Sequence, residues 1–542
     1  MSQRGTAQGA SSIRRLVEIP AVLFLVVVVA MQSLSTEDIR FWDETVTLSN
    51  GLNVDSQGWP TWSQGATYID LYWLLGTFLS DPITIYFTMR AISAVALVLG
   101  VWLATRLLAG PAIAWTLAAL AAALPITYVW PGVAGPAAGL VVVAIAVAIR
   151  WRSPVALGVA SGLLWLAAGS RAEFTLSAIA GSLLAAMWIL WLLARHRQPV
   201  GGWLWSVIST ITGAIVVPIL LFLRHGSPLE GWNRSFAAFG QHYELRFALP
   251  GDDAWQISGN VLETTFPGAT SVTEALLVNP GAFGLHVLQN ILLLPLSLGG
   301  HVTGMEPGSL LEPTIAKAMA FVVVASLAVS ILVDPRRAFG RCRSLSRGIW
   351  VPGRKIATIL MGVILLNILV TVVTIYPRPH YLLVPTMLIL VLVGVLLARV
   401  GDRRFQRWLP TGLVAMLFIV YAVLATIHFT ERLSNPPPYA SSLRLLQTSD
   451  NQWYLLAADK PVEPYVSNLT TVVPNVEGAE TFDQFLEANK INVALVLPLM
   501  GLEPYAQLPG FAEFYNDPAS SGFVQVVPES PFWVRLELVS AE

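Results

Sequence analysis

Residues 154–197 read PVALGVASGLLWLAAGSRAEFTLSAIAGSLLAAMWILWLLARHR, two apolar runs joined by one short polar turn. The runs at 154–170 and 174–194 are each long enough to cross about 30 Å of hydrocarbon as helices. Arg171 and Glu173 lie in the turn, and three consecutive basic or imidazole side chains follow the second run. The pattern predicts a membrane-spanning helical hairpin whose polar turn and basic exit lie on opposite sides of the bilayer.

Similar apolar runs lie on both sides of this hairpin. Hydrophobic residues make up 55% of the 542 residues and charged residues 12%, whereas a soluble domain is about 25% charged. The composition excludes a soluble globular protein and predicts an α-helical polytopic membrane protein with about 11 transmembrane helices. The other nine runs are 17–34, 83–105, 112–129, 134–149, 203–223, 314–333, 356–376, 381–398 and 409–428.

Basic residues alternate with these runs along the chain. Arg14 and Arg15 precede the first run, and further arginines follow the second, fourth, sixth, eighth and tenth runs, most densely in the loop 334–355. Because short basic loops stay in the cytoplasm, we expect a cytoplasmic N-terminus and an extracytoplasmic C-terminus. The sequence therefore predicts a multi-pass protein of the plasma or inner membrane.

One further apolar stretch, 285–298, does not fit this alternation. Counting it as a span would move the basic loop 334–355 to the outer face. The stretch is short and contains His286, Gln289 and Asn290. We interpret it as a re-entrant or interfacial helix within an outer loop.

Two parts follow from this topology. Residues 1–429 form the membrane module, with large outer loops at 35–82 and 224–313, and residues 430–542 form an extracytoplasmic α/β domain. In the second loop, aromatic residues at helical spacing predict an interfacial helix with His242 and Glu244 on its solvated face. In the C-terminal domain the sequence predicts a helix at 482–489, capped by Thr481 with Gln484 returning the bond, and strands at 453–456, 493–498, 523–527 and 533–539.

Acidic residues mark the first outer loop. FWDE (41–44) places Asp43 and Glu44 side by side shortly after the first membrane exit. Such acids either stabilise a helix start or face a cavity as a base or metal ligand. Asp70, in the phrase YIDLYWLL, lies in an apolar stretch where an acid is costly unless it is paired or faces water.

Cations gather at predicted outer helix ends. Arg378 and His380 lie in YPRPHYLLVP (376–385), before the tenth run. A permanent cation at a helix start either binds an anion or anchors the helix at the interface. Arg171 and Glu173 either pair with each other or line a cavity.

These motifs resemble the GT-C glycosyltransferases, in particular the family that contains the protein O-mannosyltransferases and the lipid A aminoarabinose transferase. The similar features are the acidic pair after the first helix, the long aromatic first loop, and YPRPHYLLVP, which is similar to an RYLLPLLP element of the family. The chain has YIDLYWLL where many relatives have HPPLYYLL, which argues against a protein O-mannosyltransferase proper. The resemblance implies a GT-C-like fold and a polyprenyl-phosphate sugar as donor.

The same resemblance assigns roles to the marked residues. Transfer needs a carboxylate base, for which we favour Asp43 over Glu44, and cations for the departing phosphate. Inverting transfer on the outer face, to a lipid, glycan or protein acceptor, is the expected reaction, with the bilayer and no nucleic acid as further partners. The residues expected to contact substrate are Asp70, Arg171, Glu173, Arg378, His380 and Tyr381.

Some alternatives stay open. No cofactor is required by the sequence, but a divalent cation (Mg²⁺ or Mn²⁺) is compatible with it, and Asp252 and Asp253 are additional acids. A transporter or lipid flippase is the main competing function, because Arg90 lies inside the second run. An O-antigen polymerase or ligase is a third hypothesis, although those enzymes lack paired acids soon after the first helix.

Overall fold

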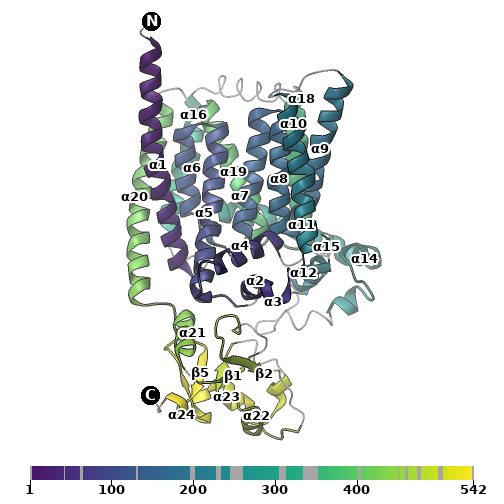
Figure 1. Ribbon diagram of the computed structural model, residues 1–542, viewed down its shortest axis with the longest axis vertical. Helices are drawn as coiled ribbons and strands as arrows, with labels where there is room; N and C mark the ends of the chain where they lie inside the picture. Colours follow the sequence, from purple (N-terminus) through teal and green to yellow (C-terminus); the bar gives the residue numbers. More distant parts are fainter. Residues whose placement is uncertain are drawn as a thin grey trace.

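Long helices form a bundle, and a small α/β domain lies at one end of it (Figure 1). Three short helices of the first loop, α2 (Asp43–Leu52), α3 (Val54–Gln57) and α4 (Ala66–Gly76), lie between the bundle and this domain. We call this end of the bundle the domain side. The computed structural model describes residues 3–41, 43–61, 65–129, 132–195, 202–227, 233–244, 261–303, 313–333, 352–400, 405–449, 451–457, 462–472, 478–497 and 504–539.

Apolar helices match all eleven predicted runs. Within the described residues, nine helices are long and apolar enough to cross a membrane, and three shorter apolar helices accompany them. The predicted fold class, a helical polytopic protein with a small α/β domain, is confirmed. The matching helices are α1 (Gln3–Thr36), α5 (Pro82–Leu108), α6 (Pro111–Ala123), α7 (Ala134–Trp151), α8 (Pro154–Ser170), α9 (Thr175–Ala194), α10 (Trp203–Ile211) with α11 (Val217–His225), α16 (Pro313–Val333), α18 (Pro352–Thr374), α19 (Pro379–Val400) and α20 (Phe405–Ser434).

Local sequence fixes where the helices begin and how closely they pack. The Asp81 side chain accepts hydrogen bonds from the backbone N–H groups of Ile83 and Thr84 and so caps α5, whose first residue is a proline. A Cβ on Gly100 of α5 would lie 2.7 Å from the Cα of Gly139 on α7. The two backbones therefore approach more closely than any larger residue would allow, as in other membrane bundles.

The helix α15 (Pro280–Thr303) is longer than the predicted stretch 285–298, and its length and composition suffice for a crossing. We predicted an interfacial helix partly because the apolar stretch is short, and that length was wrong. Its early turns pack on the last turn of α18: His286 Nε2 lies 3.0 Å from the carbonyl oxygens of Thr374 and Ile375, and Asn290 donates to Val373. The second loop also contains α12 (Asn233–Glu244) and α14 (Val272–Val278).

The C-terminal domain contains a five-stranded sheet in the order β2-β1-β3-β5-β4. Strand β1 pairs in parallel with β2 and β3, whereas β5 pairs antiparallel with β3 and β4. All four predicted strands form; β2 was missed, and the residues after Arg535 turn into a helix instead of extending β5. The elements are α21 (Pro438–Thr448), β1 (Trp453–Leu456), β2 (Leu469–Val472), α22 (Phe482–Ala488), β3 (Val493–Leu495), α23 (Phe511–Asn516), β4 (Phe523–Gln525), β5 (Phe532–Arg535) and α24 (Leu536–Val539).

Side-chain caps hold two short helices of this region, α22 and α21. The Thr481 hydroxyl accepts from the N–H of Gln484, as predicted, and the Gln484 side chain returns a bond to the N–H of Glu480, one residue before the expected donor. At the start of α21, the carboxylate of Asp38 in the first loop accepts from the N–H groups of Tyr439 (2.6 Å) and Ala440 (3.2 Å). The first loop therefore caps a helix of the C-terminal domain.

Candidate functional site

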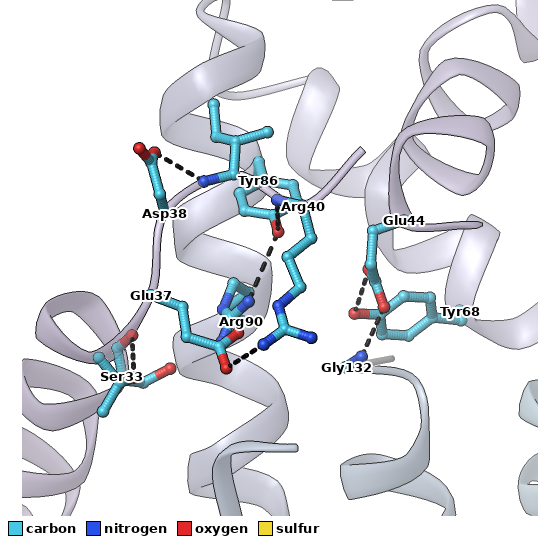
Figure 2. Close-up of polar contacts among 11 residues, drawn as sticks. Ser33, Glu37, Asp38, Arg40, Glu44, Tyr68, Tyr86, Arg90 and Gly132 are labelled. Atoms are coloured by element: carbon cyan, nitrogen blue, oxygen red, sulfur yellow. Dashed lines mark hydrogen bonds and ion pairs between the residues drawn. The ribbon is translucent and has the colours of Figure 1, made fainter. Parts of the chain in front are cut away.

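The first turn of α2 separates the two neighbouring acids. Asp43 is exposed, whereas Glu44 is 2% exposed. Glu44 accepts hydrogen bonds from the hydroxyl of Tyr68 at 3.2 Å and from the backbone N–H of Gly132 (Figure 2). It also accepts one from the hydroxyl of Tyr72, at 3.2 Å. A Cβ on Gly132 would lie 2.7 Å from the Tyr68 hydroxyl, so only glycine permits this approach.

Glu44 therefore holds the first loop in place. Its three donors come from two turns of α4 and from the segment before α7. Burial raises the pKa of Glu44, and the nearby Arg90 charge opposes that rise. A buried carboxylate with its oxygens already accepting three hydrogen bonds is suited to positioning α2, and hence Asp43, and not to meeting a substrate.

Arg90, the charge inside the second run, has its own partner. Its guanidinium lies 2.9 Å from Glu37 and 3.5 Å from the hydroxyl of Tyr86, and Glu37 also pairs with Arg40 (Figure 2). The side chain is 7% exposed. Arg90 thus forms a paired, hydrogen-bonded link between α5 and the start of the first loop, which meets the requirement for a charge at this depth.

Arg171 and Glu173 do pair with each other. Arg171 Nε lies 2.5 Å from Glu173 Oε1, and its guanidinium carbon lies 5.2 Å from the centre of the Tyr381 ring. Asn367 of α18 donates to the backbone carbonyl of Glu173. The turn between α8 and α9 is therefore fixed against α18 and the start of α19. The predicted pairing of the two residues is present, the pair lies beside Tyr381, and the lining of a cavity stays a prediction.

Asp43 acts electrostatically on cations from two other segments. Burial lowers the pKa of Arg171, but Glu173, Tyr381 and Asp43 outweigh it and raise that pKa above its usual value. Burial also lowers the pKa of Arg378, with Tyr381, Tyr376 and Asp43 opposing it. The carboxylate of the first loop and the guanidinium groups of Arg171 and Arg378 therefore share one neighbourhood on the domain side.

The second loop contributes a residue to this neighbourhood that the sequence interpretation missed. His242 of α12 is 2% exposed, and its ring stacks on Tyr376 with centroids 5.5 Å apart. Glu244, also predicted to be solvated, is buried as well. The expectation of a solvated face was wrong because α12 packs on α15 and the α18–α19 turn: Phe239 contacts Phe283 and His286.

Asp70 belongs to a different cluster. It lies 3.1 Å from His225 and 3.3 Å from Arg224, whose guanidinium carbon lies 3.3 Å from the centre of the Trp59 ring. An acid in this apolar stretch is thus paired, as its cost requires. The described contacts of Asp70 do not include Asp43, Arg171 or Arg378, and its role as a substrate ligand stays a prediction.

Metal ligands were left open by the sequence. Among the residues that the structure describes, no three or more His, Cys, Asp or Glu side chains gather in a way that could hold a metal ion. Asp252 and Asp253 lie outside the described residues.

No family model matches the sequence, and no curated protein matches it. Similar solved structures include the crystal structure of ArnT from Cupriavidus metallidurans in the apo state, which is 13% identical over 84% of this chain and 85% of that chain, with a TM-score of 0.32. A TM-score of this size carries no argument about function, which has to be argued from the residues of the site.

Proposed function

We propose that this protein is a membrane glycosyltransferase that moves a sugar, with inversion, from a polyprenyl-phosphate donor to an acceptor on the domain side. One observation supports the proposal most. The exposed carboxylate of Asp43 lies close enough to the partly buried guanidinium groups of Arg171 and Arg378 to shift their pKa values. A base and two cations at one place are what this reaction requires.

The reaction would run as a single displacement. Asp43 takes the proton from the acceptor hydroxyl as the oxygen forms a bond to the anomeric carbon. The bond from that carbon to the phosphate oxygen breaks, and the electron pair leaves with the phosphate. Fixed cations lower the barrier because negative charge grows on the phosphate in the transition state. Attack opposite the leaving group inverts the anomeric centre.

Different parts of the protein would bind the donor phosphate and the acceptor. Arg378 binds the phosphate because its guanidinium is permanently charged and offers a planar pair of donors. His380 and Tyr381, whose ring centroids lie 4.2 Å apart, continue that surface into α19. Arg171 and Glu173 line its other edge. The C-terminal domain, joined to the first loop, contributes to the acceptor side, and the acceptor is a lipid, glycan or protein.

The transporter hypothesis loses its main residue-level support. It rested on an unexplained charge inside a span, and Arg90 is paired with Glu37. A sugar-transfer assay separates the two functions directly. Purified full-length protein in liposomes receives radiolabelled polyprenyl-phosphate sugars and an acceptor lipid extract, and both the transfer of label and the movement of labelled donor between leaflets are measured.

Wild-type protein should transfer label, and Asp43→Asn should not. Asp55→Asn is the matched control, because Asp55 is an exposed acid of the same loop that bonds the Trp73 indole at 3.4 Å. Donor crossing the bilayer without transfer of label to any acceptor would overturn the proposal in favour of a flippase.

A further inference from the structure

His242 presents a buried nitrogen that the described structure does not satisfy. Its Nδ1 bonds the backbone carbonyl of Ala238 one turn earlier in α12. A carbonyl oxygen only accepts, so Nδ1 carries the hydrogen and Nε2 of the neutral ring carries a lone pair. No described residue forms a hydrogen bond with Nε2, although only 2% of the residue's surface is exposed. An unsatisfied polar atom at such burial is unusual and calls for a ligand.

The described groups that act electrostatically on the His242 ring, or stack on it, are cationic or neutral. Arg378, before α19, His380, in α19, and His286, in α15, lie close enough to interact electrostatically with the His242 ring. Tyr376, after α18, stacks on it. On α12 itself, Glu244 follows two residues later, about 200° around the helix and therefore on the opposite face. Burial first, and the Arg378 charge second, lower the pKa of His242 to about 4.

We infer that His242, Arg378 and His380 together bind a phosphate group, and that Nε2 of His242 takes up one proton from solvent as the phosphate enters. The inference deepens the proposed function, on which its identification of the ligand as the donor phosphate rests. It assigns a role in the site to the second loop. The negative charge of the phosphate favours the protonated ring and so opposes the effect of the Arg378 charge, which helps to keep the ring neutral.

The proton also serves the chemical step. The donor is a phosphodiester with one negative charge, and the leaving group is a phosphate monoester that gains the electron pair of the broken carbon–oxygen bond. The new N–H of His242 donates a hydrogen bond to that oxygen and then gives it the proton. The ring returns to its neutral form, while the proton of the acceptor hydroxyl goes to Asp43, so charge and protons balance.

The test uses binding alone. Methyl dodecyl phosphate, a diester with one fixed charge near neutral pH, is titrated into the full-length protein in detergent by calorimetry, in buffers of different ionisation enthalpy. Because the probe itself does not titrate, any proton taken up belongs to the protein. Wild-type protein should take up about one proton at pH 7, and its affinity should rise up to about tenfold for each pH unit below 7. Dimethyl phosphate, a diester with the same single charge, is run in parallel and shows whether the long alkyl chain is needed.

His242→Asn is the informative variant, since the Asn amide can still donate to the Ala238 carbonyl but lacks Nε2. It should bind the diester more weakly and take up no proton. His428→Asn is the matched control, because His428 is 40% exposed in α20. Equal proton uptake by His242→Asn and wild type would overturn the inference. If His242→Asn does not fold, a pH-independent affinity of the wild-type protein would overturn it instead.

This outcome is separable from that of the proposed function. A protein that transfers sugar but binds the diester without proton uptake refutes the role of His242 and leaves the transferase intact. A protein that takes up the proton but transfers no sugar keeps the phosphate site and refutes the transferase.

Discussion

Asp43 and Glu44 are adjacent in the chain, yet α2 directs the first carboxylate to the exposed surface and buries the second completely between two tyrosines and a backbone N–H. Consecutive residues of a helix differ by about 100° in direction, so one helix start supplies both the exposed acid that we propose as the base and the buried acid that fixes its position. Replacing each acid by its amide should therefore have different effects.

Asp43→Asn should lower turnover by about 10²–10⁴-fold or more, the usual contribution of a positioned base. The amide keeps the size and a hydrogen-bonding oxygen but cannot accept the proton. Thermal stability in detergent should hardly change, because the side chain is exposed. Full activity of Asp43→Asn beside an inactive but folded Glu44→Gln would show that the wrong acid was chosen.

Glu44→Gln should mainly destabilise the protein. The new amide N–H₂ would face groups that donate to the carboxylate, and an unsatisfied buried donor costs about 1–3 kcal/mol. Turnover of the folded fraction should fall less than in Asp43→Asn. Thermal unfolding measured on both variants decides the point, and an unchanged melting temperature for Glu44→Gln would contradict the buried network.

Arg378→Ala should weaken donor binding by about 10–100-fold, corresponding to a charged hydrogen bond of about 1.5–3 kcal/mol. Arg378→Lys should recover only part of the loss, because an ammonium lacks the planar fork. Donor affinity is measured by filter binding, with Arg444→Ala, at an exposed site in α21, as the control. Wild-type affinity in a correctly inserted Arg378→Ala would reject the phosphate contact.

Acid should destabilise the ligand-free protein partly through His242. The unfolded chain binds a proton at this residue near pH 6.5, whereas the folded chain binds it only near pH 4. Between these values the unfolded state holds more protons, so stability is fully present above about pH 6.5 and declines as the pH falls. The melting temperature of His242→Asn should decline less over this range; parallel curves for the two proteins would contradict the shifted pKa.

Topology is testable with reporter fusions. A fusion after residue 350 should report the cytoplasm, and one after residue 440 the extracytoplasmic side, because the basic loop 334–355 stays inside. A fusion at residue 308 tests α15: an extracytoplasmic signal means that α15 lies in the outer interface, and a cytoplasmic signal means that it crosses. A reversed signal at 350 or 440 would reject the predicted orientation.

The sequence predicted the bundle better than the site. Long apolar runs such as 174–194 fix a helix by themselves, because lipid leaves no other way to satisfy the backbone. The pairing of Arg171 with Glu173 could also be predicted, because the two residues share one short turn. His242 was not, because its burial depends on α12 packing against α15, and a periodic aromatic face is equally typical of a helix lying on lipid.

Short strands and cross-chain contacts were the other failures. Strand β2 (Leu469–Val472) has four residues, and only its pairing with β1 distinguishes it from a loop. Nothing in the residues around Asp38 indicates that this acid caps a helix some four hundred positions away. Such contacts depend on the whole topology, so local sequence patterns do not predict them.

That cap has a consequence for biogenesis. Asp38 emerges from the ribosome with the first span, but its partners Tyr439 and Ala440 appear only after the last span has been inserted. The same delay applies to Thr45, whose hydroxyl lies 3.3 Å from that of Tyr465. The first loop therefore cannot form these contacts until residues 439–465 have been synthesised. A nascent chain halted before residue 438 would carry Asp43 on a first loop that lacks its contacts with α21 and with Tyr465.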